Sequence, residues 1–160
     1  MKALTIWQPW ASLIMIGAKP YEFRSWAPPG WMIGRRMVIH AAARKVRPEE
    51  VVELLQRLGG ALGPTPCLKA DIAVPFLERL LDEPERLPLS HGLGCVTVGA
   101  GKRGDLCAAE FGDHAGNDSD RPGTFNWGWP MLDIKHFEPA VQCKGWQRLW
   151  NWPYPEATHG

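Results

Sequence analysis

The stretch that says most about this chain is residues 17–26, which read Gly-Ala-Lys-Pro-Tyr-Glu-Phe-Arg-Ser-Trp. Gly17 follows a short apolar segment and suits the left-handed position just beyond the end of a helix. Lys19 precedes a proline and is therefore biased away from helix. The next residues alternate as a strand does, which puts Glu22 and Arg24 on one side. The stretch predicts a helix, a turn and a strand, with three charged side chains gathered where they meet.

Outward from this stretch, the sequence predicts short elements throughout. Gly and Pro number 17 and 15 among 160 residues, so turns are frequent and long helices are not expected. Apolar alternation and β-branched runs indicate about six short strands, at 3–6, 21–26, 36–42, 93–100, 131–137 and 140–143. Apolar stripes bounded by Pro or Gly indicate short helices at 9–16, 48–58 and 75–81, and a short helix or turn at 145–150.

These elements do not alternate strictly between strand and helix. Their order favours an α+β fold, a small mixed β-barrel flanked by short helices, over a doubly wound sheet. The whole chain, 1–160, is expected to be a single domain. Within it, we interpret the acidic segment at about 60–90 as peripheral and 101–124 as a loop, with a short strand at 106–110 as an option.

The composition argues against several protein classes. No apolar run reaches the roughly 18 residues of a membrane-spanning helix, and Gln8 and Pro9 interrupt the N-terminal apolar stretch, which argues against a signal peptide. The four cysteines form no C-x-x-C pair, which indicates reduced thiols. We therefore expect a cytoplasmic protein that does not associate with membranes. Neither a metal site nor a cofactor is expected, because the Cys and His spacing does not match that of zinc ligands.

Charge is distributed unevenly along the chain, although the net charge is only +1. Residues 1–47 carry eight Lys and Arg against one acidic residue, and residues 48–125 carry seven basic and thirteen acidic residues. Such asymmetry predicts one cationic face on a nearly neutral molecule. Simple solvation of the surface by Lys and Arg is the alternative interpretation.

The tryptophans are unusual in both number and position. There are nine of them, and all lie outside residues 32–126. We interpret Trp10 and Trp150 as core residues, the common case for a large ring with an N–H partner. The candidates for stacking on a ligand are Trp26, Trp31, Trp127 and Trp129. Aromatic residues interleaved with a basic tract are typical of grooves for single-stranded nucleic acid, where each stacked base contributes about 1–3 kcal/mol.

The charged cluster of residues 17–26 admits two interpretations. Glu22 and Arg24 on one strand face can fix each other's rotamers, and the guanidinium then presents its spare donors in a defined direction. With Lys19 nearby, the cluster suits a phosphate or the edge of a base. A salt bridge that only holds the barrel shut explains the same spacing.

The sequence resembles the ASCH family, the domain named after activating signal cointegrator homology. The resemblance rests on the opening segment 2–13 and on the motif G-x-K-x-x-E-x-R, present as Gly17, Lys19, Glu22 and Arg24. It continues through Ser25-Trp26, the strand at 38–42 with its His-Ala, Trp127-Gly128-Trp129, Pro139, Lys144-Gly145 and Leu149-Trp150. It covers residues 1–47 and about 93–152, whereas the segments 60–90 and 101–124 match less well.

This resemblance implies a PUA-like fold, RNA binding, and a cleft beside the barrel that contains the motif. Some members of the family are enzymes: a short-chain branch is an amidohydrolase that acts on acetylated cytidine, and ribonuclease activity is known. The amidohydrolase branch carries Thr, its proposed nucleophile, where this chain has Glu22. Glu22 does not inherit the role of that Thr by default, and we expect it to pair with Arg24 or Lys19.

The leading hypothesis is a domain that binds single-stranded RNA or a nucleotide in a basic, Trp-lined cleft. The predicted contacts are Lys19, Glu22, Arg24, Trp26, Trp31, Arg44, Lys45, Trp127 and Trp129, with Glu22 orienting Arg24 and with Arg44 and Lys45 extending the basic track.

Two other hypotheses remain open. An enzyme acting on RNA or modified nucleosides would use Lys19, Glu22, His40 and Lys45 as candidate catalytic residues, although His40 on a strand also suits a core position. A protein-interaction module would use the acidic segment. The sequence does not distinguish RNA from DNA and does not indicate the oligomeric state.

Overall fold

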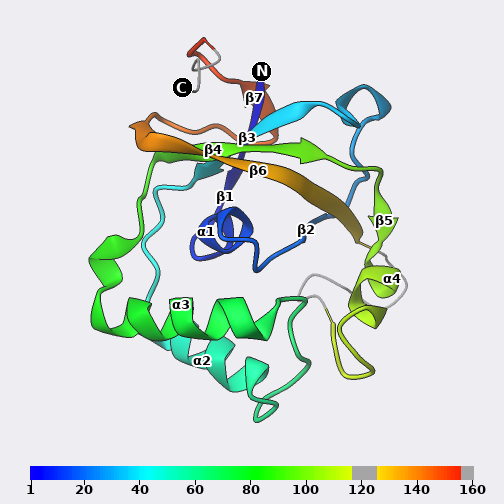
Figure 1. Cartoon of the computed structure of the whole chain (residues 1–160), viewed down its shortest axis with the longest axis vertical. Coiled ribbons are helices and arrows are strands. Elements are labelled where there is room, and N and C mark those ends of the chain that lie inside the picture. The colour runs from blue at the N-terminus through cyan, green and yellow to red at the C-terminus, as the bar shows by residue number, and fades with distance from the viewer. Residues whose placement is uncertain (117–125, 156–160) are drawn as a thin grey trace.

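The computed structural model describes residues 1–116 and 126–155 and shows a curled mixed sheet around a short helix (Figure 1). The strands are β1 (Lys2–Ile6), β2 (Tyr21–Arg24), β3 (Arg36–Ala41), β4 (His91–Val98), β5 (Lys102–Arg103), β6 (Trp127–Gln142) and β7 (Leu149–Asn151). The helices are α1 (Trp10–Met15), α2 (Pro48–Leu58), α3 (Ala70–Asp82) and α4 (Gly104–Ala109), with 3₁₀ turns at Gly30–Met32 and Pro84–Arg86. None of the described helices is long and apolar enough to cross a membrane.

The strands form one sheet in the order β2-β6-β4-β3-β1-β7, and β5 pairs with the start of β6 on the edge opposite β2. β1 and β3 run parallel, and every other pair is antiparallel. The long strand β6 pairs with β2 and β5 near its start and with β4 over the rest of its length. It therefore joins the two halves of the curl into a half-barrel.

Helix α1 lies inside this curl, where the main core forms (Figure 1). Leu4 of β1, Ile14 of α1, Met37 of β3 and Trp129 of β6 are all fully buried there. Burying one such aliphatic side chain contributes about 1.5–3 kcal/mol to stability. The buried contacts of this core thus hold α1, and the turn that follows it, against the inner face of the sheet.

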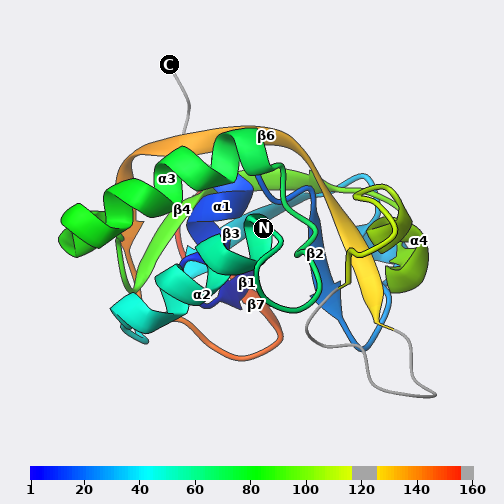
Figure 2. The same cartoon turned by 90° about the horizontal axis from the view of Figure 1, so that it is seen from below.

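Helices α2 and α3 lie side by side and cover the open side of the curl beneath α1 (Figures 1 and 2). A second apolar cluster joins Leu13 of α1, Leu54 of α2 and Leu77 of α3. Because α1 contributes to both clusters, it is the element that connects the sheet to the helical layer.

The predicted α+β architecture, a small mixed barrel flanked by short helices, is confirmed in the form of this half-barrel. Helix α2 has the predicted bounds, 48–58, with Pro48 in its first turn. The Glu50 carboxylate accepts a hydrogen bond from the Arg47 N–H at 2.8 Å, which satisfies a donor at the start of that helix. The predicted strands at 3–6, 36–42 and 93–100 correspond to β1, β3 and β4.

In the middle of the chain, the start of one predicted helix and the assignment of one predicted loop are wrong. Helix α3 begins at Ala70, five residues before the predicted start, because the Lys69 carbonyl accepts hydrogen bonds from Ile72 and Ala73 and the helix tolerates Pro75 in its second turn. Residues 104–109 form helix α4, not a loop with a strand at 106–110. The part of the predicted loop at 117–124 lies outside the described residues.

Two predictions near the C-terminus are also wrong. The predicted strands 131–137 and 140–143 belong to one strand, β6, whose apolar alternation is interrupted by the left-handed residue Asp133 (φ 48°) and by Pro139. Residues 149–151 form strand β7, where we predicted a helix or turn, because they pair with β1 through Lys2 and Leu4. Long-range pairing outweighs local preference in both places.

Candidate functional site

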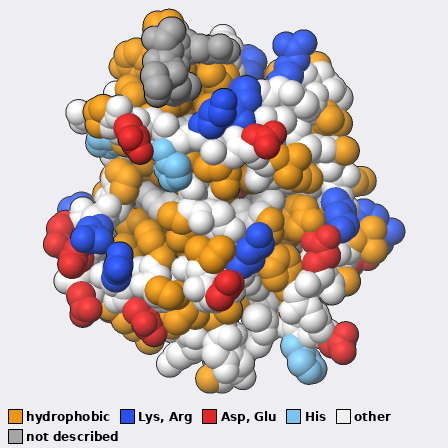
Figure 3. Space-filling model, viewed as in Figure 1, with side chains coloured by type: hydrophobic (Ala, Val, Ile, Leu, Met, Phe, Trp, Pro, Cys, Tyr) orange, Lys and Arg blue, Asp and Glu red, His pale blue; other side chains and the backbone are white. Residues whose placement is uncertain are grey.

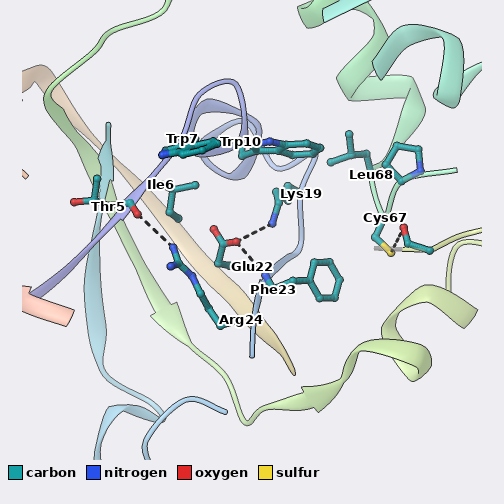
Figure 4. Close-up of a pocket in the computed structure, with 12 residues that line it drawn as sticks. Thr5, Ile6, Trp7, Trp10, Lys19, Glu22, Phe23, Arg24, Cys67 and Leu68 are labelled. Carbon is teal, nitrogen blue, oxygen red and sulfur yellow. Dashed lines mark hydrogen bonds and ion pairs between the residues drawn. The ribbon is translucent and has the colours of Figure 1, made fainter. Parts of the chain in front are cut away.

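A pocket of about 330 Å³ opens between the end of β1, the α1–β2 turn and the segment before α3. Its polar lining is formed by Lys19, Glu22 and Arg24, the charged residues of the sequence motif, and we call it the motif pocket. Figure 4 shows the indole rings of Trp7 and Trp10 edge-on, on the side of the pocket opposite Glu22 and Arg24. The structure thus brings the whole predicted charged cluster to one cavity.

Gln8 holds in place the short helix that carries Trp10. Its buried amide accepts a hydrogen bond from the Ser12 N–H at 3.0 Å and donates to the Ser12 hydroxyl at 2.8 Å and to the Pro88 carbonyl at 3.0 Å. This amide satisfies a backbone donor at the start of α1, where Pro9 provides no side-chain cap. At the other end of α1, Gly17 adopts the predicted left-handed conformation (φ 82°), which turns the chain into the motif.

Lys19 and Glu22 form a buried ion pair, with Lys19 Nζ 3.5 Å from Glu22 Oε1 and residue exposures of 6% and 8%. Lys19 also donates to the Tyr21 carbonyl, and Glu22 Oε1 accepts from the Phe23 N–H at 3.0 Å. Burial lowers the pKa of Lys19 below its ordinary value, against the opposing effect of the adjacent Glu22 carboxylate. Glu22 Oε2 is buried with no hydrogen-bond partner among the described residues. Glu22, which lines the pocket, thus keeps one unsatisfied acceptor.

Arg24 does not pair with Glu22, contrary to the prediction that Glu22 orients it. Its Nη2 donates instead to the Thr5 carbonyl at 3.3 Å, and its Nε is buried without a partner among the described residues. The turn at residues 19–22 brings Lys19 back over the Glu22 carboxylate, so of the two partners expected for Glu22 it pairs with the lysine and not with Arg24. Arg24 is thus oriented by the end of β1.

The aromatic side of the pocket was missed by sequence reasoning. Trp7 is 59% exposed, and the guanidinium of Arg44 lies 4.5 Å from the centre of its ring. Trp10, which we predicted to be a core residue, packs partly against the core but also lines the pocket, with Lys19 Nζ 5.9 Å from its ring centre. The spacing of Trp7 and Trp10 around the start of α1 was the only available sequence signal.

The four indoles that we predicted to stack lie outside the motif pocket. Trp129 is fully buried, and its Nε1 donates to the Trp26 carbonyl at 2.9 Å. A buried ring offers no face to a base, so Trp129 is a core residue, because β6 turns its side chain into the curl. Trp26 and Trp127 are half-buried against the core, and Trp31 is 52% exposed but lines a different cavity.

His40, a candidate catalytic residue, is buried and bonded through both ring nitrogens. Its Nδ1 lies 3.2 Å from the Thr5 hydroxyl and its Nε2 lies 2.7 Å from the Cys143 carbonyl. Burial lowers its pKa below the ordinary value. The motif pocket does not include His40. Within residues 1–116 and 126–155, no group of three or more His, Cys, Asp or Glu is placed to hold a metal ion.

Arg44 and Lys45, which were expected to extend the basic track, do not line the motif pocket. Arg44 forms an ion pair with Glu50, just as Lys19 does with Glu22. Lys45 is exposed and does not line the motif pocket. On the face shown in Figure 3, Lys and Arg side chains are interspersed with Asp and Glu. Lys2, Arg35 and Arg36 of the same basic segment, 1–47, line a separate cavity.

Comparisons with known proteins identify the family of this chain. Two similar solved structures are of mutant forms of ZmASCH from Zymomonas mobilis, each with a TM-score of 0.47 and 15% identity, covering 88% of this chain and 72% and 74% of theirs. No curated protein matches the sequence significantly. The model of the ASCH domain matches residues 4–100, more than half of the chain, and this region contains Lys19, Glu22 and Arg24. The chain belongs to the ASCH domain family.

Proposed function

We propose that this ASCH domain binds single-stranded RNA or a nucleotide, with one base held in the motif pocket. The family is PUA-like and associated with RNA binding. The observation that carries the proposal is the buried Glu22 carboxylate, which pairs with Lys19 through one oxygen while the other has no partner among the described residues. Buried polar atoms are rarely left unpaired in proteins, so a ligand donor is the expected partner.

The polar groups around the pocket complement the edge of a base. An amino group on the base would donate to Glu22 Oε2, and Lys19 or Arg24 would donate to a neighbouring ring nitrogen or carbonyl oxygen. Cytosine, adenine and guanine each present an amino group beside an acceptor. Uracil presents one N–H between two carbonyl oxygens, which a carboxylate and the two cations also complement, so the polar groups alone do not select one base.

The aromatic lining supplies the stacking surface. Trp7 and Trp10 line one side of the pocket, and the ring of Phe23 lies 5.3 Å from Lys19 Nζ. Stacking of a base on an aromatic ring contributes about 1–3 kcal/mol, independently of sequence. The volume of about 330 Å³ is at the lower end of the range for small-molecule sites, as a single base requires.

The test is a titration with cytidine and uridine monophosphates and a short single-stranded RNA, followed by Trp fluorescence. Arg24→Ala is expected to weaken binding about tenfold or more, since a hydrogen bond from a charged group contributes about 1.5–3 kcal/mol. Arg35→Ala is the matched control, because it removes the same charge from an exposed residue that does not line the pocket. Equal losses in the two variants, or no binding to wild type, would contradict the proposal.

One observation favours an enzyme as the second candidate function. Lys19, whose pKa is lowered by burial, lies beside a carboxylate, and such a pair can exchange a proton with a substrate. Incubation with labelled RNA and with acylated nucleosides tests this possibility. Turnover that Lys19→Met abolishes would establish it, whereas binding without turnover would exclude it for those substrates.

A further inference from the structure

We infer that an RNA strand leaves the motif pocket through a second cavity, in which Lys144 and Arg148 contact its phosphates and Trp146 stacks on a second base. This inference rests on the proposed function. The cavity, about 870 Å³, lies between the ends of β1 and β3 and the segment 142–148, and we call it the strand groove. It shares Thr5, Trp7 and Arg24 with the motif pocket, so the two form one continuous surface.

The charge of the groove suits a polyanion. Lys144 and Arg148 are exposed, line the groove and form no ion pair with a described residue. Arg24 adds a third cation at the boundary with the motif pocket. No Asp or Glu is among the described residues that line the groove. This contrasts with the mixed charges of the face shown in Figure 3.

The groove also has its own stacking residue. Trp146 is 59% exposed, as is Trp7 at the boundary. Lys144 Nζ lies 4.7 Å from the centre of the Trp146 ring, so a cation and an aromatic face are presented together. Cations combined with aromatic faces are the recognition elements for single-stranded nucleic acid. An acidic peptide would use the cations but has no bases to stack on the rings.

The segment that forms the far side of the groove is fixed by buried contacts. A Cβ at Gly145 would lie 2.5 Å from His40 Cε1 and 2.6 Å from the Thr5 hydroxyl oxygen, so only glycine permits this close approach. The His40 ring bonds the Cys143 carbonyl at 2.7 Å, just before the cationic residues. His40 is therefore a positioning residue for the strand groove.

The experiment compares a mononucleotide with a tetranucleotide RNA of the same base, measured by fluorescence anisotropy or calorimetry. Trp146→Ala and the double variant Lys144→Ala/Arg148→Ala are expected to weaken tetranucleotide binding about tenfold and to leave mononucleotide binding unchanged. The double variant should also reduce the slope of log K against log salt by about 0.7 for each phosphate that the protein no longer neutralises. Lys135→Ala is the control, since Lys135 is exposed on β6 and lines neither cavity.

The outcomes separate this inference from the proposed function. If the tetranucleotide binds wild type no more tightly than the mononucleotide, or if the groove variants weaken both ligands equally, the strand groove is excluded. Lys19→Met/Glu22→Gln reports on the motif pocket alone, because neither residue lines the groove. If that variant binds the tetranucleotide as wild type does while Trp146→Ala does not, no base is held in the motif pocket, and the strand groove alone binds the RNA.

Discussion

Among single residues, Lys19 and Glu22 are expected to affect stability strongly, because both are charged and buried. Removing one partner of such a pair leaves an uncompensated buried charge, whereas removing both does not. Glu22→Ala is therefore expected to reduce the free energy of unfolding by about 3 kcal/mol. Lys19→Met/Glu22→Leu should recover most of that loss in urea unfolding. A double variant less stable than Glu22→Ala would show that the pair is not coupled.

The lowered pKa of His40 is expected to make the stability of the fold depend on pH. Its pKa in the folded state is lowered from 6.5 by burial, so the unfolded chain binds the proton more readily. The free energy of unfolding should be at its full value above pH 6.5 and should fall as the pH drops through the interval between 6.5 and the folded pKa. Urea unfolding from mildly alkaline to mildly acidic pH measures this effect.

The variant His40→Gln is the control for that profile. It keeps an amide donor and acceptor in place of the ring but does not titrate. Its stability should fall less than that of the wild type over the same pH interval, because the contribution of His40 is absent. Parallel profiles for the two proteins would show that His40 is not responsible.

At the level of elements, β4 depends on a glycine where it crosses the core. A Cβ at Gly94 would overlap the Lys135 carbonyl oxygen of β6 and lie 2.5 Å from Met15 Cε of α1. Gly94→Ala is therefore expected to reduce the free energy of unfolding by about 2–3 kcal/mol through overpacking. Gly30→Ala is the matched control, since a Cβ at Gly30 meets nothing within 4 Å. Equal stability of the two variants would contradict this packing.

Elements whose stability is local could be predicted from the sequence. Helix α2 has its own apolar stripe, Pro48 in the first turn and Gly59 at its end, and its bounds were predicted correctly. Strand β7 has only three residues and forms by pairing with β1 from the opposite end of the chain. No local pattern identifies such a strand, because its hydrogen bonds depend on the closed sheet.

The difference between local and long-range contacts also explains which site residues could be predicted from the sequence. Lys19, Glu22 and Arg24 were identified because they are neighbours in sequence and therefore in space. Which tryptophans join them depends on how the sheet curls: Trp129 points into the curl, whereas Trp7 lies at its rim. Ring burial is a property of packing and not of spacing along the chain.

For the molecule as a whole, the nine tryptophans provide a direct test, because their indole N–H groups can be followed separately by NMR. We predict that a short single-stranded RNA shifts the signals of Trp7, Trp10 and Trp146 and leaves those of Trp31 and Trp129 in place. The exposed Trp31 is an internal control, since it lines a different cavity. A shift at Trp31 with none at Trp7 and Trp10 would contradict the placement of the base in the motif pocket.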